Sequence, residues 1–287
     1  MKNTEGFNFT FYLLIVPVLL WLILLIVLPH IDLFISSFQV DSDTGGKIFT
    51  FEHYATFFKN KIYWLTFVNT AAYAIGITVL SFIVTFPVAF YLTKVISKKY
   101  SGFLTLLLLI PIWVGELVTV YGWMIILGDH GIINEFLMYT GLIDKPIKML
   151  YSNFSMVVGL LYFSMLFMIV PVMSTLESLD DSLIEAASDL GASKWTIFTK
   201  IIIPYSMPGI TSGGIIVFML VIGDFVVPDI LGGKSSLWFT EQIYNEFLST
   251  FNWGEGAAFG FLLLVISSFI IWIALKLTGQ KLERVGS

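Results

Sequence analysis

The sequence predicts an all-α protein with six membrane-spanning helices, and three observations lead to that class. The chain of 287 residues is 57% hydrophobic and 12% charged, with a mean hydropathy of +0.90. Soluble domains are about 45–50% apolar and about 25% charged. Several apolar runs reach about 20 residues, enough to cross a hydrocarbon core about 30 Å thick. The alternation that marks the strands of a membrane β-barrel is absent, so we expect helices.

Six apolar segments define the expected spans. They cover approximately residues 9–29, 64–93, 103–127, 154–178, 209–229 and 257–277. The first segment lacks the small-residue cleavage site of a signal peptide, so we expect it to be retained as a helix. Because no soluble domain or low-complexity tract is evident, residues 1–287 are expected to form one transmembrane domain.

The basic residues predict the orientation of these spans. With six spans both ends of the chain lie on one side, and cytoplasmic loops carry an excess of Lys and Arg. If the ends are cytoplasmic, nine basic residues lie on that side: Lys2, Lys94, Lys98, Lys99, Lys194, Lys200, Lys276, Lys281 and Arg284. Six lie on the outer side: Lys47, Lys59, Lys61, Lys145, Lys148 and Lys234. We therefore expect both termini in the cytoplasm.

Composition also excludes several kinds of site. The absence of cysteine excludes disulfides, cysteine metal sites and thiol catalysis. A net charge of −5 argues against a nucleic-acid partner. The three histidines, His30, His53 and His130, are scattered, and no His-Glu-x-x-His zinc pattern is present. We expect neither a catalytic residue nor a metal site.

A partly polar loop, at about residues 179–208, separates the fourth and fifth spans. Ser182 and Glu185 have the spacing of a capping box, which predicts the start of a helix. Gly191 suits the left-handed turn that ends a helix. A helix this short is marginal alone in water, so we expect it to dock on a partner. A second helix is expected after Ser193, ending before the fifth span at Pro204 and Pro208.

The residues of this loop resemble the EAA loop of ABC-importer permeases. That pattern reads Glu-Ala-Ala, three residues, Gly, nine residues, Ile, any residue, Leu and Pro, and here only Ile203 departs from it, replacing Leu. The resemblance implies type I ABC-importer permease architecture and a loop that receives mechanical force from a separate ATPase. The expected coupling residues are Leu183, Glu185, Ala186, Ala187, Leu190 and Gly191.

Other stretches resemble the B-type permease subunit of bacterial spermidine/putrescine importers. They are Leu108–Trp113, Tyr121–Gly122, Ile133–Leu137, Leu190–Lys194 and Phe225–Gly233. The resemblance implies a bacterial inner-membrane pump with four kinds of part: this subunit, a homologous second permease, an ATPase dimer that uses ATP and Mg, and an extracytoplasmic polyamine-binding protein. We expect no cofactor in this chain, since Pro228 occupies the first glycine position of the phosphate-loop-like segment that ends at Ser235.

Carboxylates interrupt two of the expected spans. Glu116 falls in the third, Asp224 in the fifth, and Asp229 near the outer end of the fifth. Each acid at membrane depth costs roughly 2.5–3.5 kcal/mol on insertion scales, so these residues are candidates for the substrate path. The aromatic candidates near the breaks are Trp113, Tyr121, Trp123 and Phe225. In a polyamine path, carboxylates would pair with amines, and aromatic faces would cover the methylene stems.

Alternatives stay open for these residues and for the function. Asp229 also suits the headgroup region, Glu116 could cap a helix or pair with the second permease, and the aromatics could form an interfacial belt. Gly209-x3-Gly213 marks close helix packing, either within the chain or between permeases. A related importer for ferric iron, a phosphonate or an oxyanion remains possible, although acidic breaks favour a cation. A secondary transporter needs no coupling loop. The Gly-x-Gly-Asp motif of intramembrane aspartyl proteases is incomplete here, because Val221 stands at its first glycine position.

Overall fold

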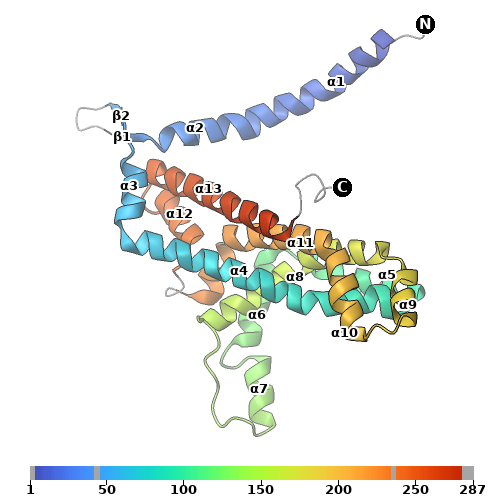
Figure 1. Cartoon of the computed structure of the whole chain (residues 1–287). Helices are drawn as coiled ribbons and strands as arrows, with labels where there is room; N and C mark the ends of the chain where they lie inside the picture. Colours follow the sequence, from blue (N-terminus) through green and yellow to red (C-terminus); the bar gives the residue numbers. More distant parts are fainter. Residues whose placement is uncertain (1–3, 42–45, 234–236, 280–287) are drawn as a thin grey trace. The chain divides into compact units, whose positions relative to one another are not determined.

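The computed structural model describes residues 4–41, 46–233 and 237–279 (Figure 1). Four residues of the turn expected at Asp41–Gly46 lie outside these ranges, as do Lys2, Lys234, Lys281 and Arg284 of the orientation argument. Within them all regular structure is helical, apart from one antiparallel ribbon of β1 (Gln39–Asp41) and β2 (Lys47–Phe49).

Most of the described helices follow one another with short connections, and the longer connection at residues 140–152 joins α7 to α8. The α-helices are α1 (Thr4–Leu22), α2 (Leu28–Ser36), α3 (Glu52–Lys59), α4 (Lys61–Phe90), α5 (Lys98–Leu109), α6 (Glu116–Leu127), α7 (Ile132–Tyr139), α8 (Asn153–Ser178), α9 (Asp181–Asp189), α10 (Lys194–Ile197), α11 (Ile203–Gly223), α12 (Phe239–Leu248) and α13 (Trp253–Thr278). Single turns of wider π-helix form η1 (Ile23–Val27), η2 (Tyr91–Val95), η4 (Phe198–Ile202) and η5 (Pro228–Gly232), and η3 (Ile110–Trp113) is a 3₁₀ turn.

Six helical runs in the described part of the chain are long and apolar enough to cross a membrane. They are Phe11–Ser36, Lys61–Val95, Glu116–Tyr139, Asn153–Ser178, Lys194–Gly223 and Trp253–Thr278. The prediction of an all-α protein with six spans is therefore confirmed. The boundaries of the third and fifth spans differ from those expected.

The third segment is broken where the sequence predicted a continuous span. Pro111 lies in the 3₁₀ turn η3, and Val114 and Gly115 after it have extended backbone, with ψ of 119° and 146°. A proline removes one backbone donor and disturbs the preceding turn, so the helix stops here and restarts at Glu116. This break places Glu116 at the beginning of α6.

The fifth span starts earlier than expected, because α10, η4 and α11 form one helical run. The expectation that Pro204 and Pro208 end the second loop helix is wrong. Pro204 lies in the first turn of α11, directly after the π turn η4, where the regular hydrogen-bond pattern is already interrupted. Pro208 lies inside α11. The run ends at Gly223, before residues 224–229.

The contacts of the chain group it into two compact units. Unit 1 comprises Met1–Trp64 and Gln242–Leu264, and unit 2 comprises Leu65–Glu241 and Val265–Ser287. In unit 1, the ring of Phe259 packs on those of Phe57 and Tyr63, at centroid distances of 5.8 Å and 4.8 Å. The expectation of one domain over residues 1–287 stays a prediction.

In unit 2, α8 packs along α11 (Figure 1). Gly209 lies against the Pro171 carbonyl and the Thr175 side chain, and a Cβ added at Gly213 would lie 2.7 Å from Met168 Sδ. The small residues of α11 thus let two helices of the same chain approach closely. Of the two roles open for Gly209-x3-Gly213, internal packing is the one that the structure supports.

Candidate functional site

A cavity of about 330 Å³ lies in unit 2, where the third and fifth segments are both broken. Its lining includes Glu116, Asp224, Phe225, Phe163, Met219 and Leu220. The lining therefore comes from α6, from α8 and from the end of α11 with the residues that follow. Three of the seven path residues expected from the sequence, Glu116, Asp224 and Phe225, meet here.

Asp224 stands at the break of the fifth segment and orders the turn after it. Its backbone is extended, with φ of −74° and ψ of 137°. Its Oδ1 accepts hydrogen bonds from the N–H groups of Val226 at 2.8 Å and Val227 at 3.3 Å. Its carbonyl oxygen accepts a hydrogen bond from Thr240 Oγ1 at 2.5 Å. The carboxylate therefore caps the next helical turn while it lines the cavity.

Glu116 faces Asp224 across the cavity. It is the first residue of α6, and its carboxyl lines the same cavity as the Asp224 carboxyl, near enough for the two charges to interact. The described residues that line the cavity include no Lys, Arg or His. Two carboxyl groups so close together, without a basic side chain between them, form a site that attracts a cation.

The other expected path residues lie away from this lining. Trp113 is 90% exposed, and Tyr121 is 54% exposed. Trp123 makes an edge-on contact with Tyr162, with ring centroids 5.4 Å apart. Asp229 is exposed at the start of η5. A role for these four residues in transport stays a prediction.

Sequence reasoning missed Phe163 and Met219, which line the cavity from α8 and α11. Both are apolar residues of long apolar spans, and neither is itself charged or part of a break. An apolar residue that faces a cavity has no signal that separates it from one that faces lipid. Only the packing of α8 on α11 reveals their position.

The loop between the fourth and fifth spans forms the expected short helix, α9, but with a different cap. The N-cap is Asp180, whose Oδ1 accepts a hydrogen bond from the Ser182 N–H at 2.9 Å, so the predicted capping box of Ser182 and Glu185 is wrong. Asp caps a helix as well as Ser does, and Asp180 precedes the first turn. The hydrogen bond from Ser182 holds the pKa of the Asp180 carboxyl below its ordinary value of 3.8. Gly191 has the expected left-handed backbone, with φ of +79°.

The expected coupling residues lie mostly on the surface of α9. Glu185, Ala186 and Gly191 are exposed, and Ala187 is half-buried. Leu183 is 49% exposed and Leu190 is 88% exposed. Two exposed leucines on a short helix are suited to a groove on another protein, but the coupling role itself stays a prediction. The second loop helix, α10, begins after Ser193 as expected.

The described residues offer no group of three or more His, Cys, Asp or Glu side chains that could hold a metal ion. Glu116 and Asp224 provide only two carboxyl groups. The described geometry is that of a membrane protein with a small acidic cavity and an exposed, capped loop helix.

Residues 82–283 match the family described as "Binding-protein-dependent transport system inner membrane component". The chain belongs to this family, the ABC-importer permeases. The spermidine/putrescine transport system permease protein PotB of Salmonella typhimurium (strain SL1344) is 33% identical over 290 residues, which cover 99% of each chain. The PotB protein of Escherichia coli (strain K12) is 34% identical over 275 residues, covering 94% of this chain and 99% of its own.

Solved structures agree with this fold. One chain of a bacterial alginate ABC transporter, crystallised with an alginate pentasaccharide-bound periplasmic protein, superposes with a TM-score of 0.79 at 18% identity. The match covers 96% of this chain and 98% of that one. The fold is therefore that of an ABC-importer permease, as the resemblance implied.

Proposed function

We propose that this chain is the transmembrane permease subunit of an ATP-driven polyamine importer. The observation that carries the proposal is the pair of carboxyl groups, Glu116 and Asp224, that face each other in a cavity lined by no described basic residue. A polyamine presents several ammonium groups, which carboxylates bind in charge-assisted hydrogen bonds. An anionic solute such as an oxyanion or a phosphonate would be repelled by the same pair.

Two further observations support a polyamine over another cation. Phe163 and Phe225 place aromatic rings beside the carboxyl pair, where ring faces can attract ammonium groups and cover methylene stems. Two relatives that match over nearly their whole length are named spermidine/putrescine transport system permease proteins. A hydrated metal ion such as ferric iron would gain less from the aromatic rings. The choice between spermidine and putrescine belongs to the external binding protein.

The mechanism follows from α9 and the broken spans. ATP binding closes a separate ATPase dimer, which moves the docked α9 and opens the path to the outside. The binding protein then releases a polyamine to the carboxyl pair, and ATP hydrolysis returns the path to the inward-facing state. Two carboxyl groups bind the cation weakly enough for it to leave again. ATP and Mg act in the ATPase, and this chain contributes no catalytic group.

A homologous second permease supplies the other half of the path. Residues 11–36, which form the first span, are exposed or half-buried, and they include a row of large apolar side chains such as Leu14, Trp21 and Leu25. Lipid covers part of that surface, and the second permease covers another part. With both termini in the cytoplasm of a bacterium, α9 faces the ATPase, and the α6–α7 segment lies on the outer side of the membrane.

The test is uptake and ATP hydrolysis by the reconstituted assembly of this chain, its second permease, the ATPase and the binding protein in lipid vesicles. Spermidine and putrescine should stimulate hydrolysis, and Asp224→Asn should raise the KM for uptake at least about tenfold. A charge-assisted hydrogen bond contributes about 1.5–3 kcal/mol, and about 1.4 kcal/mol corresponds to a factor of ten. The amide oxygen of Asn still caps the turn at Val226, so the fold is kept.

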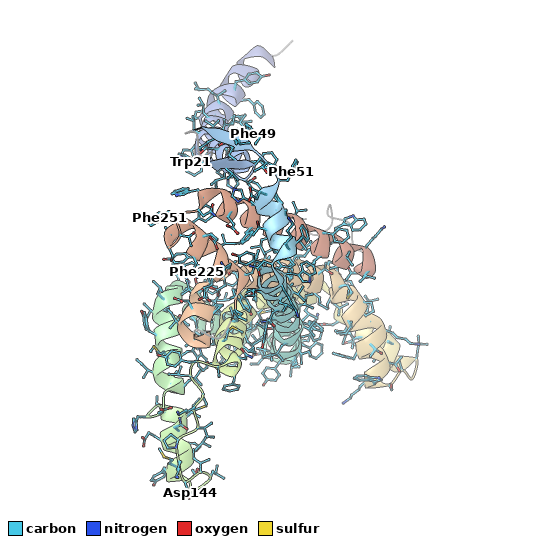
Figure 2. All side chains as sticks on the ribbon, turned by 90° about the vertical axis from the view of Figure 1, so that its left-hand side faces the viewer. Trp21, Phe49, Phe51, Asp144, Phe225 and Phe251 are labelled. Atoms are coloured by element: carbon cyan, nitrogen blue, oxygen red, sulfur yellow. The ribbon has the colours of Figure 1, made fainter. Side chains whose placement is uncertain are left out.

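Asp144→Asn is the matched control, because Asp144 is exposed at the far tip of the segment that carries α7 (Figure 2). It should leave the KM unchanged. Stimulation by phosphonate or ferric iron instead of polyamines would refute the substrate and leave the permease. Uptake that needs no ATP would favour a secondary transporter.

A further inference from the structure

Lys94 joins three elements at the cytoplasmic end of unit 2. It lies in the last turn of η2, directly after the long span α4. Its Nζ donates a hydrogen bond to the carbonyl oxygen of Leu179 at 2.5 Å and another to Asp181 Oδ1 at 2.7 Å. Leu179 is the C-cap of α8, and Asp181 is the first residue of α9. One ammonium group therefore links α4, α8 and the coupling helix.

Both partners of Lys94 are suited to hold a cation in place. The carbonyl of Leu179 belongs to the end of a helix, where carbonyls lack partners within the helix and carry the negative end of the dipole. Asp181 adds a full negative charge. The side chain of Lys94 is 9% exposed, whereas that of Asp181 is 72% exposed. The lysine is thus fixed inside the protein and holds an acid at the surface.

Beyond the buried Leu179 and the Asp180 cap, packing does little to fix the start of α9. The residues of α9 are all exposed or half-buried. A cavity of about 810 Å³ lies beside the contact, lined by Lys94, Lys98, Glu177, Asp180 and Asp181. Open space at this side of the helix start means that dense packing does not hold it there. The chain after η2 turns away in an extended conformation at Ile96, with ψ of 149°.

We infer that Lys94 is a positioning residue that ties the start of α9 to the ends of α4 and α8, so that movement of α9 is passed to the spans. The inference rests on the proposed role of α9 in coupling to an ATPase. When the ATPase moves α9, the ammonium bridge moves α4 and α8 with it. Without the bridge, α9 stays bound to the ATPase but tilts into the neighbouring cavity, and ATP is hydrolysed with less uptake.

The test compares Lys94→Met, Lys94→Arg and Asp181→Asn in the full reconstituted assembly. Lys94→Met keeps the length and apolar stem of the side chain and removes the ammonium group. Asp181→Asn weakens the same bridge from an exposed position, where folding is not at risk. Lys98→Met is the matched control, because Lys98 lines the same cavity from the start of α5 but is exposed. Three quantities are measured: substrate imported per ATP hydrolysed, ATPase subunit retained on purification, and amide hydrogen exchange over residues 181–190.

Lys94→Met is expected to lower the import per ATP at least threefold, to speed amide exchange in α9, and to leave the retained ATPase unchanged. Asp181→Asn should likewise lower the import per ATP and speed amide exchange in α9. Lys94→Arg should restore most of the import per ATP, and Lys98→Met should match the wild type. Unchanged exchange in α9 would overturn the bridge, and faster exchange with a normal import ratio would overturn its role in coupling. A wild-type assembly without ATP-driven uptake would overturn the proposed function itself.

Discussion

At the scale of single residues, carboxylates of this chain hold the local backbone in place, and one of them also lines the acidic cavity. Asp224 caps the turn at Val226 while it lines the cavity, and Asp180 caps α9. In both, a carboxylate accepts backbone N–H bonds at the start of a helix, where negative charge is favourable. Replacement by Asn and replacement by Ala therefore test different properties, since Asn keeps the acceptor and Ala removes it.

Asp180 gives the residue-scale prediction. Asp180→Ala should speed amide exchange at Ser182 and Leu183 severalfold, because the cap is lost, whereas Asp180→Asn should change it little. The pKa of Asp180 is lowered in the folded protein, so its stabilising effect is complete above the ordinary value of 3.8 and is lost only as the pH falls through the lower folded value. Between pH 5 and pH 8, about the range in which proteins are most stable, wild-type α9 should show no change in protection due to Asp180. Equal exchange in the Ala variant and the wild type would contradict the cap.

The sequence predicted Asp224 and Glu116 as path residues because a charged residue is rare in an apolar span. It predicted Phe225 because this aromatic residue directly follows Asp224. It placed the N-cap of α9 two residues too late. Both Asp180 and the Ser182/Glu185 pair are good caps in sequence, and only the path of the chain after Leu179 decides between them. Lys94 appeared only among the nine basic residues that predicted the orientation. Its partner carbonyl at Leu179 leaves no mark in a sequence.

At the scale of elements, the long apolar helices were predictable and their ends were not. An apolar run of about 20 residues identifies a span whatever its neighbours are. Prolines were misread in the fifth span because a proline after a π turn continues a helix, as Pro204 does. Pro111 has the opposite outcome, because the helix ends there and the backbone of Gly115, directly before Glu116, is extended. The presence of a proline therefore does not by itself tell whether a helix continues or ends.

The packing of α8 on α11 gives the element-scale prediction. Gly209→Ala should lower the melting temperature of the purified assembly, because its Cβ would meet the Pro171 carbonyl and Thr175. Overpacking of this kind costs about 1–3 kcal/mol. Gly102→Ala in α5 is the control, since a Cβ there meets no atom of the described structure within 4 Å. A melting temperature equal to that of the control would show that α8 and α11 separate easily, against the structure.

At the scale of the whole molecule, a permease of this family works only as part of an assembly, and its surfaces agree with that. Its first span exposes apolar side chains over residues 11–36, and α9 exposes Leu183 and Leu190. The first surface is suited to lipid and a second permease, and the other to a soluble ATPase. These assignments require α9 and both termini to lie on the cytoplasmic side.

Orientation is therefore the whole-molecule prediction, and the absence of cysteine from the sequence allows a direct test. Asp144→Cys, at the tip of the α7 segment, should react with a membrane-impermeant maleimide added outside right-side-out vesicles (Figure 2). Ser97→Cys, an exposed position between η2 and α5, should react only after the vesicles are permeabilised. The cysteine-free wild type should remain unlabelled. The reverse pattern would place α9 outside the cell, where no ATP is available, and the coupling mechanism would be lost together with the role inferred for Lys94.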